Sequence, residues 1–247
     1  MTTKDELTLR VPASCRPGEK DRTKRQFSES VEEYIDGIYR LQHEFESVQT
    51  GHIATYMFVS PGSATTMVKR LAELGLVHHV PYQGIRLTDY GMKVAKQLTR
   101  AHRVLKSFLH DELGLPWNDL HELACKLEHY IGEDIINRMW DKMGQPIFDP
   151  QGAPIDPDLE DPSRRLQEIE PGEFRVYRVT DERVEFLAHL EEIGLVPRKK
   201  FRAISATKID SLINLEIDGR TVTVGKEVAR HVWVVPEDYK WPGESGS

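Results

Sequence analysis

From Ser28 onward, hydrophobic side chains recur with the 3.6-residue period of an α-helix. The pattern predicts a first helix over 28–42, a short second helix over 51–58 and a third helix that begins after Ser60. Ser60 is a residue type that caps helix N-termini, and the proline that follows it suits a first helical turn. We expect the third helix to end at Gly75, because glycine readily adopts the backbone conformation that terminates a helix.

Two short segments of alternating polarity follow the third helix, at 76–80 and 84–87, with the turn-forming sequence 81–84 between them. Alternation on both sides of such a turn predicts a β-hairpin. Thr88 is then positioned to cap a long helix that reaches about residue 110.

Three helices and a hairpin in this order describe a winged helix-turn-helix, in which the third helix enters the major groove of DNA and the hairpin flanks the backbone. Small hydroxyl side chains on that helix permit close approach, and basic side chains neutralise phosphates. The alternative is the solvated outer face of an ordinary three-helix core. The expected DNA-contacting residues are Ser60, Gly62, Ser63, Thr65, Thr66, Lys69, Arg70 and, on the wing, Arg86.

The rest of the chain divides into a helical stretch and a β-rich end. Two more helices are predicted between about 118 and 143, separated at Gly132, and a proline-rich composition typical of linkers extends over 144–172. Beyond it, short β-like runs interrupted by one helix at 182–192 predict a small SH3-like barrel.

Charge is unevenly distributed in this chain of 247 residues with a net charge of −7. Residues 60–110 carry eight Lys or Arg against two acids, whereas residues 111–170 carry five against fifteen, so one region suits a polyanion and the other suits cations. The two cysteines, Cys15 and Cys125, fit a reducing compartment. No apolar run is long enough to span a membrane and the N-terminus lacks a signal-peptide pattern, so we expect a cytoplasmic protein.

The segment 121–129 is the strongest candidate for metal binding. At about 100° per residue, an arc of roughly 100° on one helical face holds His121, Cys125, Glu128 and His129. One helix cannot complete a coordination sphere, and the further candidates elsewhere are Glu33, Asp36 and His102. Carboxylates and imidazoles suit Mn²⁺ or Fe²⁺, while the thiolate favours softer ions such as Fe²⁺, Co²⁺ or Zn²⁺.

Three other classes of function stay open on these residues. His121, Glu122 and Cys125 are one ligand short of the zinc-protease pattern H-E-x-x-H, which would make Glu122 the base of a metallohydrolase. The chain could instead be a metal-independent winged-helix regulator with a small-molecule pocket, or a protein that stores or delivers metal. Hydrolysis that is lost in Glu122→Gln would identify a metallohydrolase. DNA binding that chelator does not change would identify the metal-independent regulator, and metal binding without DNA affinity would identify a storage or delivery protein.

Taken together, the motifs resemble the diphtheria-toxin-repressor and manganese-transport-regulator family over about residues 28–236, in the longer form with a C-terminal SH3-like (FeoA-like) domain. The most specific feature is a helix-turn-helix combined with the His/Cys/Glu/His run. The segments that carry the resemblance are SVEEYI (30–35), VSP (59–61), MVKRL (67–71), LGLV (74–77), GIRLT (84–88), AHR (101–103), HxxxCxxEH (121–129) and DPQGAPI (149–155). The resemblance implies a homodimer that binds Mn²⁺ or Fe²⁺ and then palindromic operators, usually to repress metal-uptake genes, and it implies no enzyme.

The resemblance and the composition together give the expected organisation of the chain. The fold class is mainly α with a small β domain. The expected parts are a disordered arm (1–27), a winged helix-turn-helix DNA-binding domain (28–96), a metal-binding and dimerisation domain (97–163), a linker (164–172), an SH3-like domain (173–236) and an unstructured tail (237–247).

By position, the resemblance also implies two metal sites. The primary site is implied at Glu33, Cys125, Glu128 and His129, with Asp36 as a further manganese-type ligand. A carboxylate at Glu33 matches the manganese sensors of the family, whereas Cys125 matches its iron sensors, so the set is a hybrid. The ancillary site is implied at His102, His121, Glu182 and Glu185, but its usual carboxylate four residues after the first histidine is here Lys106.

An ammonium at Lys106 would repel a bound cation, so the ancillary site is expected to be weakened or rebuilt, with Glu182 and Glu185 in compensation. The primary metal is expected to act as corepressor. It would tie the first helix to the helix over 121–129 and so fix the spacing of the two recognition helices in the dimer.

Overall fold

The computed structural model describes residues 27–80, 84–207 and 212–243. The expected N-terminal arm apart from Phe27, residues 81–83 of the expected hairpin turn and the last four residues of the expected tail lie outside the described residues. The helices are α1 (Glu29–Glu44), α2 (Thr50–Tyr56), α3 (Pro61–Glu73), α4 (Asp89–Asp111), α5 (Leu120–Glu128), α6 (Glu133–Lys142), a 3₁₀ turn (Leu166–Glu168), α7 (Val184–Ile193) and α8 (Lys226–His231). The strands are β1 (Val77–Val80), β2 (Gly84–Leu87), β3 (Arg164–Arg165), β4 (Gly172–Val179), β5 (Lys200–Thr207), β6 (Leu212–Ile217), β7 (Arg220–Val224) and β8 (Val232–Pro236).

The winged-helix unit formed by α1, α2, α3, β1 and β2 follows the predicted pattern. The Oγ atom of Ser60 accepts the backbone N–H of Ser63 at 3.1 Å and caps α3, and Gly75 has a φ of +72° beyond its end. β1 and β2 pair antiparallel, with Val77 opposite Leu87. Buried side chains of all five elements and of the start of α4 form one core, which holds α3 and the hairpin against α1.

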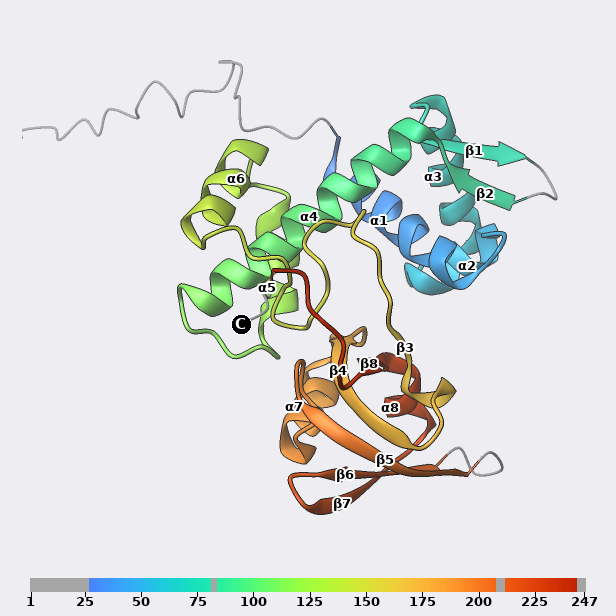
Figure 1. Cartoon of the computed structure of the whole chain (residues 1–247). Helices are drawn as coiled ribbons and strands as arrows, with labels where there is room; N and C mark the ends of the chain where they lie inside the picture. Colours follow the sequence, from blue (N-terminus) through green and yellow to red (C-terminus); the bar gives the residue numbers. More distant parts are fainter. Residues whose placement is uncertain (1–26, 81–83, 208–211, 244–247) are drawn as a thin grey trace, which may run out of the picture.

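Helix α4, at 23 residues, connects this unit to the rest of the chain, as Figure 1 shows. The Oγ1 atom of Thr88 accepts the backbone N–H of Gly91 at 2.9 Å, which confirms the predicted cap. A Cβ atom at Gly91 would lie 2.0 Å from the carbonyl oxygen of Leu76, so the close approach of helix and hairpin requires glycine there. Across the described ranges, no helix combines the length and the apolar character that a membrane span needs.

The second half of α4 packs against α5 and α6, and the buried residues of these helices continue into the C-terminal sheet as one cluster. That sheet is antiparallel, with the strand order β3-β8-β4-β5-β6-β7. Figure 1 shows it below the helical part, with α7 and α8 beside it. The expectation of a mainly α chain with a small β domain at its end is therefore confirmed.

Three details of the C-terminal part differ from the expectation. Residues 164–172 are not a linker, because β3 pairs with β8 and Leu166 is fully buried. The sequence pattern does not predict α8, because a six-residue helix is too short to show a helical period. Helix α7 begins at Val184, so Glu182 precedes the helix instead of lying on it.

The expectation of an unstructured tail is wrong for the described residues 237–243. The ring of Trp241 stacks on that of Tyr177, with centroids 5.0 Å apart and planes 8° apart, and the Arg198 guanidinium carbon lies 3.5 Å from the Trp241 ring centroid. Consecutive residues Val176 and Tyr177 of β4 point to opposite faces of the sheet, so Val176 is buried in the main core and Tyr177 in the aromatic one. The tail thus closes a small aromatic core, and Figure 1 shows its dark red trace turning back from β8 toward the helices.

We predict that Trp241→Ala lowers the free energy of unfolding by about 3–5 kcal/mol, since it removes a buried aromatic ring that the rest of this core cannot replace. Urea denaturation followed by circular dichroism measures the change. The matched control is Tyr130→Ala, because Tyr130 is an aromatic residue that is 74% exposed and should change stability by about 0.5 kcal/mol or less. Equal stability of Trp241→Ala and the unsubstituted protein would show that the tail contributes nothing to the fold.

Candidate functional site

Side chains from α4, α5 and the segment before α7 meet in a half-buried cluster of metal-binding residue types. One ring nitrogen each of His102 and His121 and the Sγ atom of Cys125 lie within 4.8 Å of one another. The Nε2 atom of His102 is 3.4 Å from Nδ1 of His121, and Sγ of Cys125 is 3.7 Å from Nε2 of His121. Two imidazoles and a thiol at these separations are a donor set that suits divalent transition metals.

The histidines and the thiol of this cluster stabilise each other's charged forms. Burial raises the pKa of the Cys125 thiol, but hydrogen bonds and positive charge from His102 and His121 outweigh burial and lower the pKa to about 7. Burial lowers the pKa of His121, and here the hydrogen bonds to Cys125 and Glu182 prevail and raise it to about 9. Near neutral pH a large fraction of Cys125 is therefore thiolate, which is the form that binds metal.

The end of α5 extends the cluster toward α1. An Oε2 atom of Glu128 lies 2.7 Å from Nδ1 of His102, and Nδ1 of His129 lies 2.9 Å from Oε2 of Glu32. His129 follows the last helical residue, so its ring points to α1 while His121 points to α4 and α7. The predicted donors of segment 121–129 thus belong to one continuous polar chain, but they do not all face a single point.

Glu32 is a member of this chain that the sequence pattern did not single out. Its side chain is only 4% exposed, although glutamate is one of the residue types most rarely buried. Glu32 lies three residues before Ile35 on the apolar face of α1, and a charged residue on an apolar face is the signal that could have identified it. By bonding one ring nitrogen of His129, Glu32 fixes the orientation of that ring and leaves the other nitrogen for a ligand.

Of the remaining predicted primary ligands, Glu33 lies near His129 and Asp36 does not. Glu33, Glu29 and His129 each offer a donor atom within 4.8 Å of the others. Asp36 instead accepts a hydrogen bond from Arg40 at 2.7 Å, one helical turn away. Within the described residues Asp36 joins no group of metal donors, because Arg40 already neutralises its carboxylate.

The predicted ancillary residues are only partly brought together. Glu182 lies with the histidines, with Oε2 at 3.0 Å from Nδ1 of His121 and Oε1 at 3.8 Å from Nε2 of His102. Glu185 is exposed on the first turn of α7 and joins no donor group in the described part of the chain. Because Glu182 precedes the helix, the helical spacing that would place the two carboxylates on one face does not apply.

Lys106 lies buried beside these residues, with 3% of its surface exposed. Its Nζ atom is 2.7 Å from Oε1 of Glu182 and 2.8 Å from Oδ2 of Asp149, and it donates a hydrogen bond to the side-chain oxygen of Gln151. Burial alone would lower the pKa of Lys106, but the two carboxylates prevail and raise it, so the ammonium stays charged. Glu182 of the implied ancillary set is therefore paired with this ammonium in the structure.

Glu182 is also one point at which the winged-helix unit contacts the C-terminal part. Its Oε2 atom accepts a hydrogen bond from the Arg40 guanidinium at 3.3 Å. Burial raises the pKa of Glu182, but the charge of Lys106, the hydrogen bonds from His102 and His121 and the charge of Arg40 more than reverse this and hold the pKa well below its usual range. Glu182 is consequently an ionised carboxylate surrounded by cationic groups.

The expected DNA-contacting residues lie at the exposed start of α3 and on the hairpin. Ser60, Gly62, Ser63, Thr66, Lys69, Arg70 and Arg86 are exposed, and Thr65 is half-buried. The Thr65 and Thr66 hydroxyls donate to the carbonyl oxygens of Pro61 and Gly62, so they would offer lone pairs rather than protons to a ligand. Arg86 donates to the carbonyl oxygen of Glu46 and keeps its charge at the surface.

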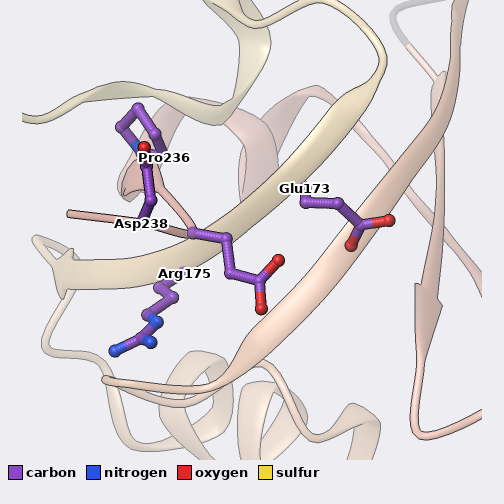
Figure 2. Close-up of a pocket in the computed structure, with 5 residues that line it drawn as sticks. Glu173, Arg175, Pro236 and Asp238 are labelled. Carbon is purple, nitrogen blue, oxygen red and sulfur yellow. The ribbon is translucent and has the colours of Figure 1, made fainter.

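A pocket and a further donor group in the C-terminal part offer weaker candidates for a functional site. A pocket of about 440 Å³ is lined by Glu173, Arg175, Pro236, Glu237 and Asp238, and Figure 2 shows Glu173 and Arg175 pointing away from each other rather than to a common centre. A third donor group joins Asp181, Glu227 and His231, but Arg183 forms ion pairs with both carboxylates. Glu122 is also unsuited to catalysis, because it is exposed and paired with Lys126.

Comparison with protein families gives three matches along the chain. Residues 26–85 match the N-terminal DNA-binding domain of iron-dependent repressors, and residues 88–157 match their metal-binding and dimerisation domain. Residues 164–236 match the FeoA domain. The three matches follow one another with short gaps, and the last begins at β3, in agreement with the pairing of that strand.

Individual relatives agree with these matches. The chain is 36% identical over 113 residues to an uncharacterised HTH-type transcriptional regulator of Methanocaldococcus jannaschii, covering 45% of this chain and 90% of that protein. It is 28% identical over 224 residues to the iron-dependent repressor IdeR of Mycobacterium tuberculosis, covering 83% and 96%. Among solved structures, a manganese-dependent transcriptional repressor in complex with manganese aligns with a TM-score of 0.78 and 31% identity over 83% of this chain and 99% of that one. ScaR with bound Zn²⁺ aligns with a TM-score of 0.75 and 29% identity over the same shares.

We predict that Glu32→Ala lowers the affinity of the protein for Mn²⁺ by about 10- to 100-fold, the range found when the residue that orients a metal-binding histidine is removed. Isothermal titration calorimetry with buffered Mn²⁺ measures the change. The control is Glu44→Ala, which removes an exposed glutamate from the other end of the same helix and should leave the affinity unchanged. Equal affinities for Glu32→Ala and Glu44→Ala would mean that Glu32 does not act on the metal site.

Proposed function

The chain belongs to the iron-dependent repressor family, and on that basis we propose which of its residues sense the metal and which contact DNA. It is a metal-dependent, DNA-binding transcriptional repressor and not an enzyme, with divalent iron or manganese as corepressor. Its DNA-binding and dimerisation domains give it DNA and a second copy of itself as partners. We further propose that the operator is palindromic, since a twofold dimer presents two equivalent recognition helices.

The proposed primary metal site consists of Glu33, Cys125, Glu128 and His129, with Glu32 orienting the histidine. The observation that carries this proposal is the 2.9 Å contact between Glu32 of α1 and His129 at the end of α5. This contact joins α1 of the winged-helix unit to the end of α5 in the metal-binding part. Glu33 of α1 also offers a donor atom there. Asp36 is left out of the set, because Arg40 holds its carboxylate.

Repulsion between carboxylates explains how this site would control DNA binding. Glu29, Glu32, Glu33 and Glu128 gather around His129, and like charges at such short distances disfavour a close contact between α1 and α5. A bound divalent cation supplies the positive charge that offsets this repulsion. Helix α1 shares one core with α3, so fixing α1 against α5 also fixes the recognition helix relative to the dimerisation part.

The proposed DNA contacts are the exposed residues at the start of α3 and on the hairpin. Lys69, Arg70 and Arg86 neutralise phosphates, while the small residues Ser60, Gly62, Ser63, Thr65 and Thr66 permit close approach to the groove. We expect the genes under its control to encode metal uptake and the protein to act in the cytoplasm, where its DNA partner lies.

We propose Mn²⁺ as the corepressor, with Fe²⁺ as the alternative and Zn²⁺ or Co²⁺ binding in vitro. Glu33 and Glu128 supply hard oxygen ligands that suit Mn²⁺, and His129 is acceptable to either ion. Cys125 is the one soft ligand in the proposed set and favours the later metals. Its side chain is therefore the expected determinant of metal choice.

We predict that chelator weakens binding to a palindromic operator, selected from random duplexes in the presence of Mn²⁺, by about 5- to 150-fold, the usual range of coupling between two ligands. Fluorescence anisotropy at fixed salt, with EDTA and then with buffered free Mn²⁺, measures the effect. Lys69→Ala serves as the comparison, because loss of a phosphate contact should weaken binding to every duplex and flatten its salt dependence. Equal operator affinity with and without chelator would disprove the role of the metal.

We predict that Cys125→Glu shifts the preference of the protein from Fe²⁺ toward Mn²⁺, because a carboxylate replaces the one soft ligand in the set. The matched variant Glu128→Ala removes charge without changing softness and should weaken the binding of every divalent ion. Competition titrations with Mn²⁺, Fe²⁺ and Zn²⁺ on both variants separate these effects. A uniform loss for all three ions in Cys125→Glu would show that Cys125 does not select the metal.

A further inference from the structure

We infer that the ammonium group of Lys106 is a permanent cation in the position where the family resemblance implies a second metal ion. The inference rests on the proposed function for the primary metal site, but the contacts around Lys106 stand independently of it. In this view the protein senses metal at one site per chain. The second position holds the helical part and the C-terminal part together whether or not metal is present.

Geometry supports the substitution of an ammonium for a metal ion. The Nζ atom of Lys106 is within 2.8 Å of one oxygen each of Glu182 and Asp149 and also donates to Gln151. An ammonium has three protons, and two hydrogen bonds and one ion pair from three different residues surround this one. Lys106 is therefore held by the protein itself.

Charge opposes the entry of a second metal ion. Two carboxylates, Glu182 and Asp149, already face the ammonium of Lys106, and Glu182 also faces the Arg40 guanidinium. A divalent cation at His102 and His121 would lie beside both positive groups and would compete with them for Glu182. The other anionic groups at these histidines, Glu128 and Cys125, belong to the proposed primary site. Glu185 is exposed, and the position of Lys106 is basic.

The oxygen atoms that surround Lys106 belong to segments that attach the C-terminal part to α4. Asp149 and Gln151 belong to a turn that packs against β4, since the backbone N–H of Val179 donates to the carbonyl oxygen of Gln151 at 2.9 Å. The Asp149 carboxylate also accepts the backbone N–H groups of Gln151 and Ala153 at 3.0 and 2.9 Å. Lys106 on α4 thus neutralises the carboxylate that organises this turn.

Glu182 extends the same connection to the winged-helix unit. Its carboxylate contacts Lys106 of α4, His121 of α5 and Arg40 of α1, and the residue lies just before α7. Removal of the ammonium would take from the buried Asp149 its ion-pair partner, and loss of one partner of a buried ion pair destabilises its surroundings. The attachment of β4 and α7 to α4 is the part of the structure that should loosen.

Two measurements on the full-length protein test the inference. The first is the number of Mn²⁺ ions bound per chain, determined by equilibrium dialysis and elemental analysis, for which we expect one in the unsubstituted protein and two in Lys106→Glu. The second is hydrogen exchange of the Gln151, Ala153 and Val179 amides in EDTA. In Lys106→Met we expect these amides to exchange at least about tenfold faster than in the unsubstituted protein. In Lys106→Glu we expect fast exchange in EDTA and slow exchange once Mn²⁺ is added.

The matched control is Lys96→Met, because Lys96 lies on the same helix and forms a surface ion pair with Asp158. It should leave both the stoichiometry and the exchange of the three amides unchanged. If Lys106→Glu does not fold, the stoichiometry of the unsubstituted protein and the exchange of Lys106→Met still decide the question. Two Mn²⁺ ions per unsubstituted chain, or slow exchange in Lys106→Met, would overturn the inference, whereas no bound Mn²⁺ at all would instead contradict the proposed primary site.

Discussion

A continuous line of buried and half-buried ionisable side chains links the three parts of this protein. It runs from Glu32 on α1 through His129, Glu128, His102 and His121 to Glu182 before α7. Charges removed from water destabilise a protein unless each one meets a partner, so every member of the line depends on its neighbours. The mutual position of the winged-helix unit, the metal-binding helices and the sheet follows from this requirement.

The same line explains why the site is sensitive to its ligand. His102 and His121 lower the pKa of Cys125 to about 7, so a soft ligand is ready near neutral pH at a point where hard carboxylates are also present. Relatives that are named for iron and for manganese align with the chain over similar lengths. A mixed donor set of this kind is consistent with a chain that lies between the two groups.

The sequence predicts helices α1 to α7, the hairpin and the concentration of donor residues over 121–129, because each depends on local period, on capping residues or on spacing along one helix. It does not predict β3, which has two residues, or the burial of Trp241, which depends on Tyr177 and Arg198 far away in the chain. The same limit applies to the site. The pairing of Asp36 with Arg40 and the contact of Glu32 with His129, 97 residues away, depend on the folded chain and are not visible in a local pattern.

The fixed ammonium of Lys106 has a consequence for how the repressor would respond to rising metal concentration. A dimer with two exchangeable ions per protomer could couple four binding events and switch over a narrow range. A protomer that carries one of its two cations as part of its own chain exchanges only one ion, and its dimer couples at most two events. Such a repressor would give a gradual dose–response curve, and gene expression would follow metal supply over a broad range instead of switching at a threshold.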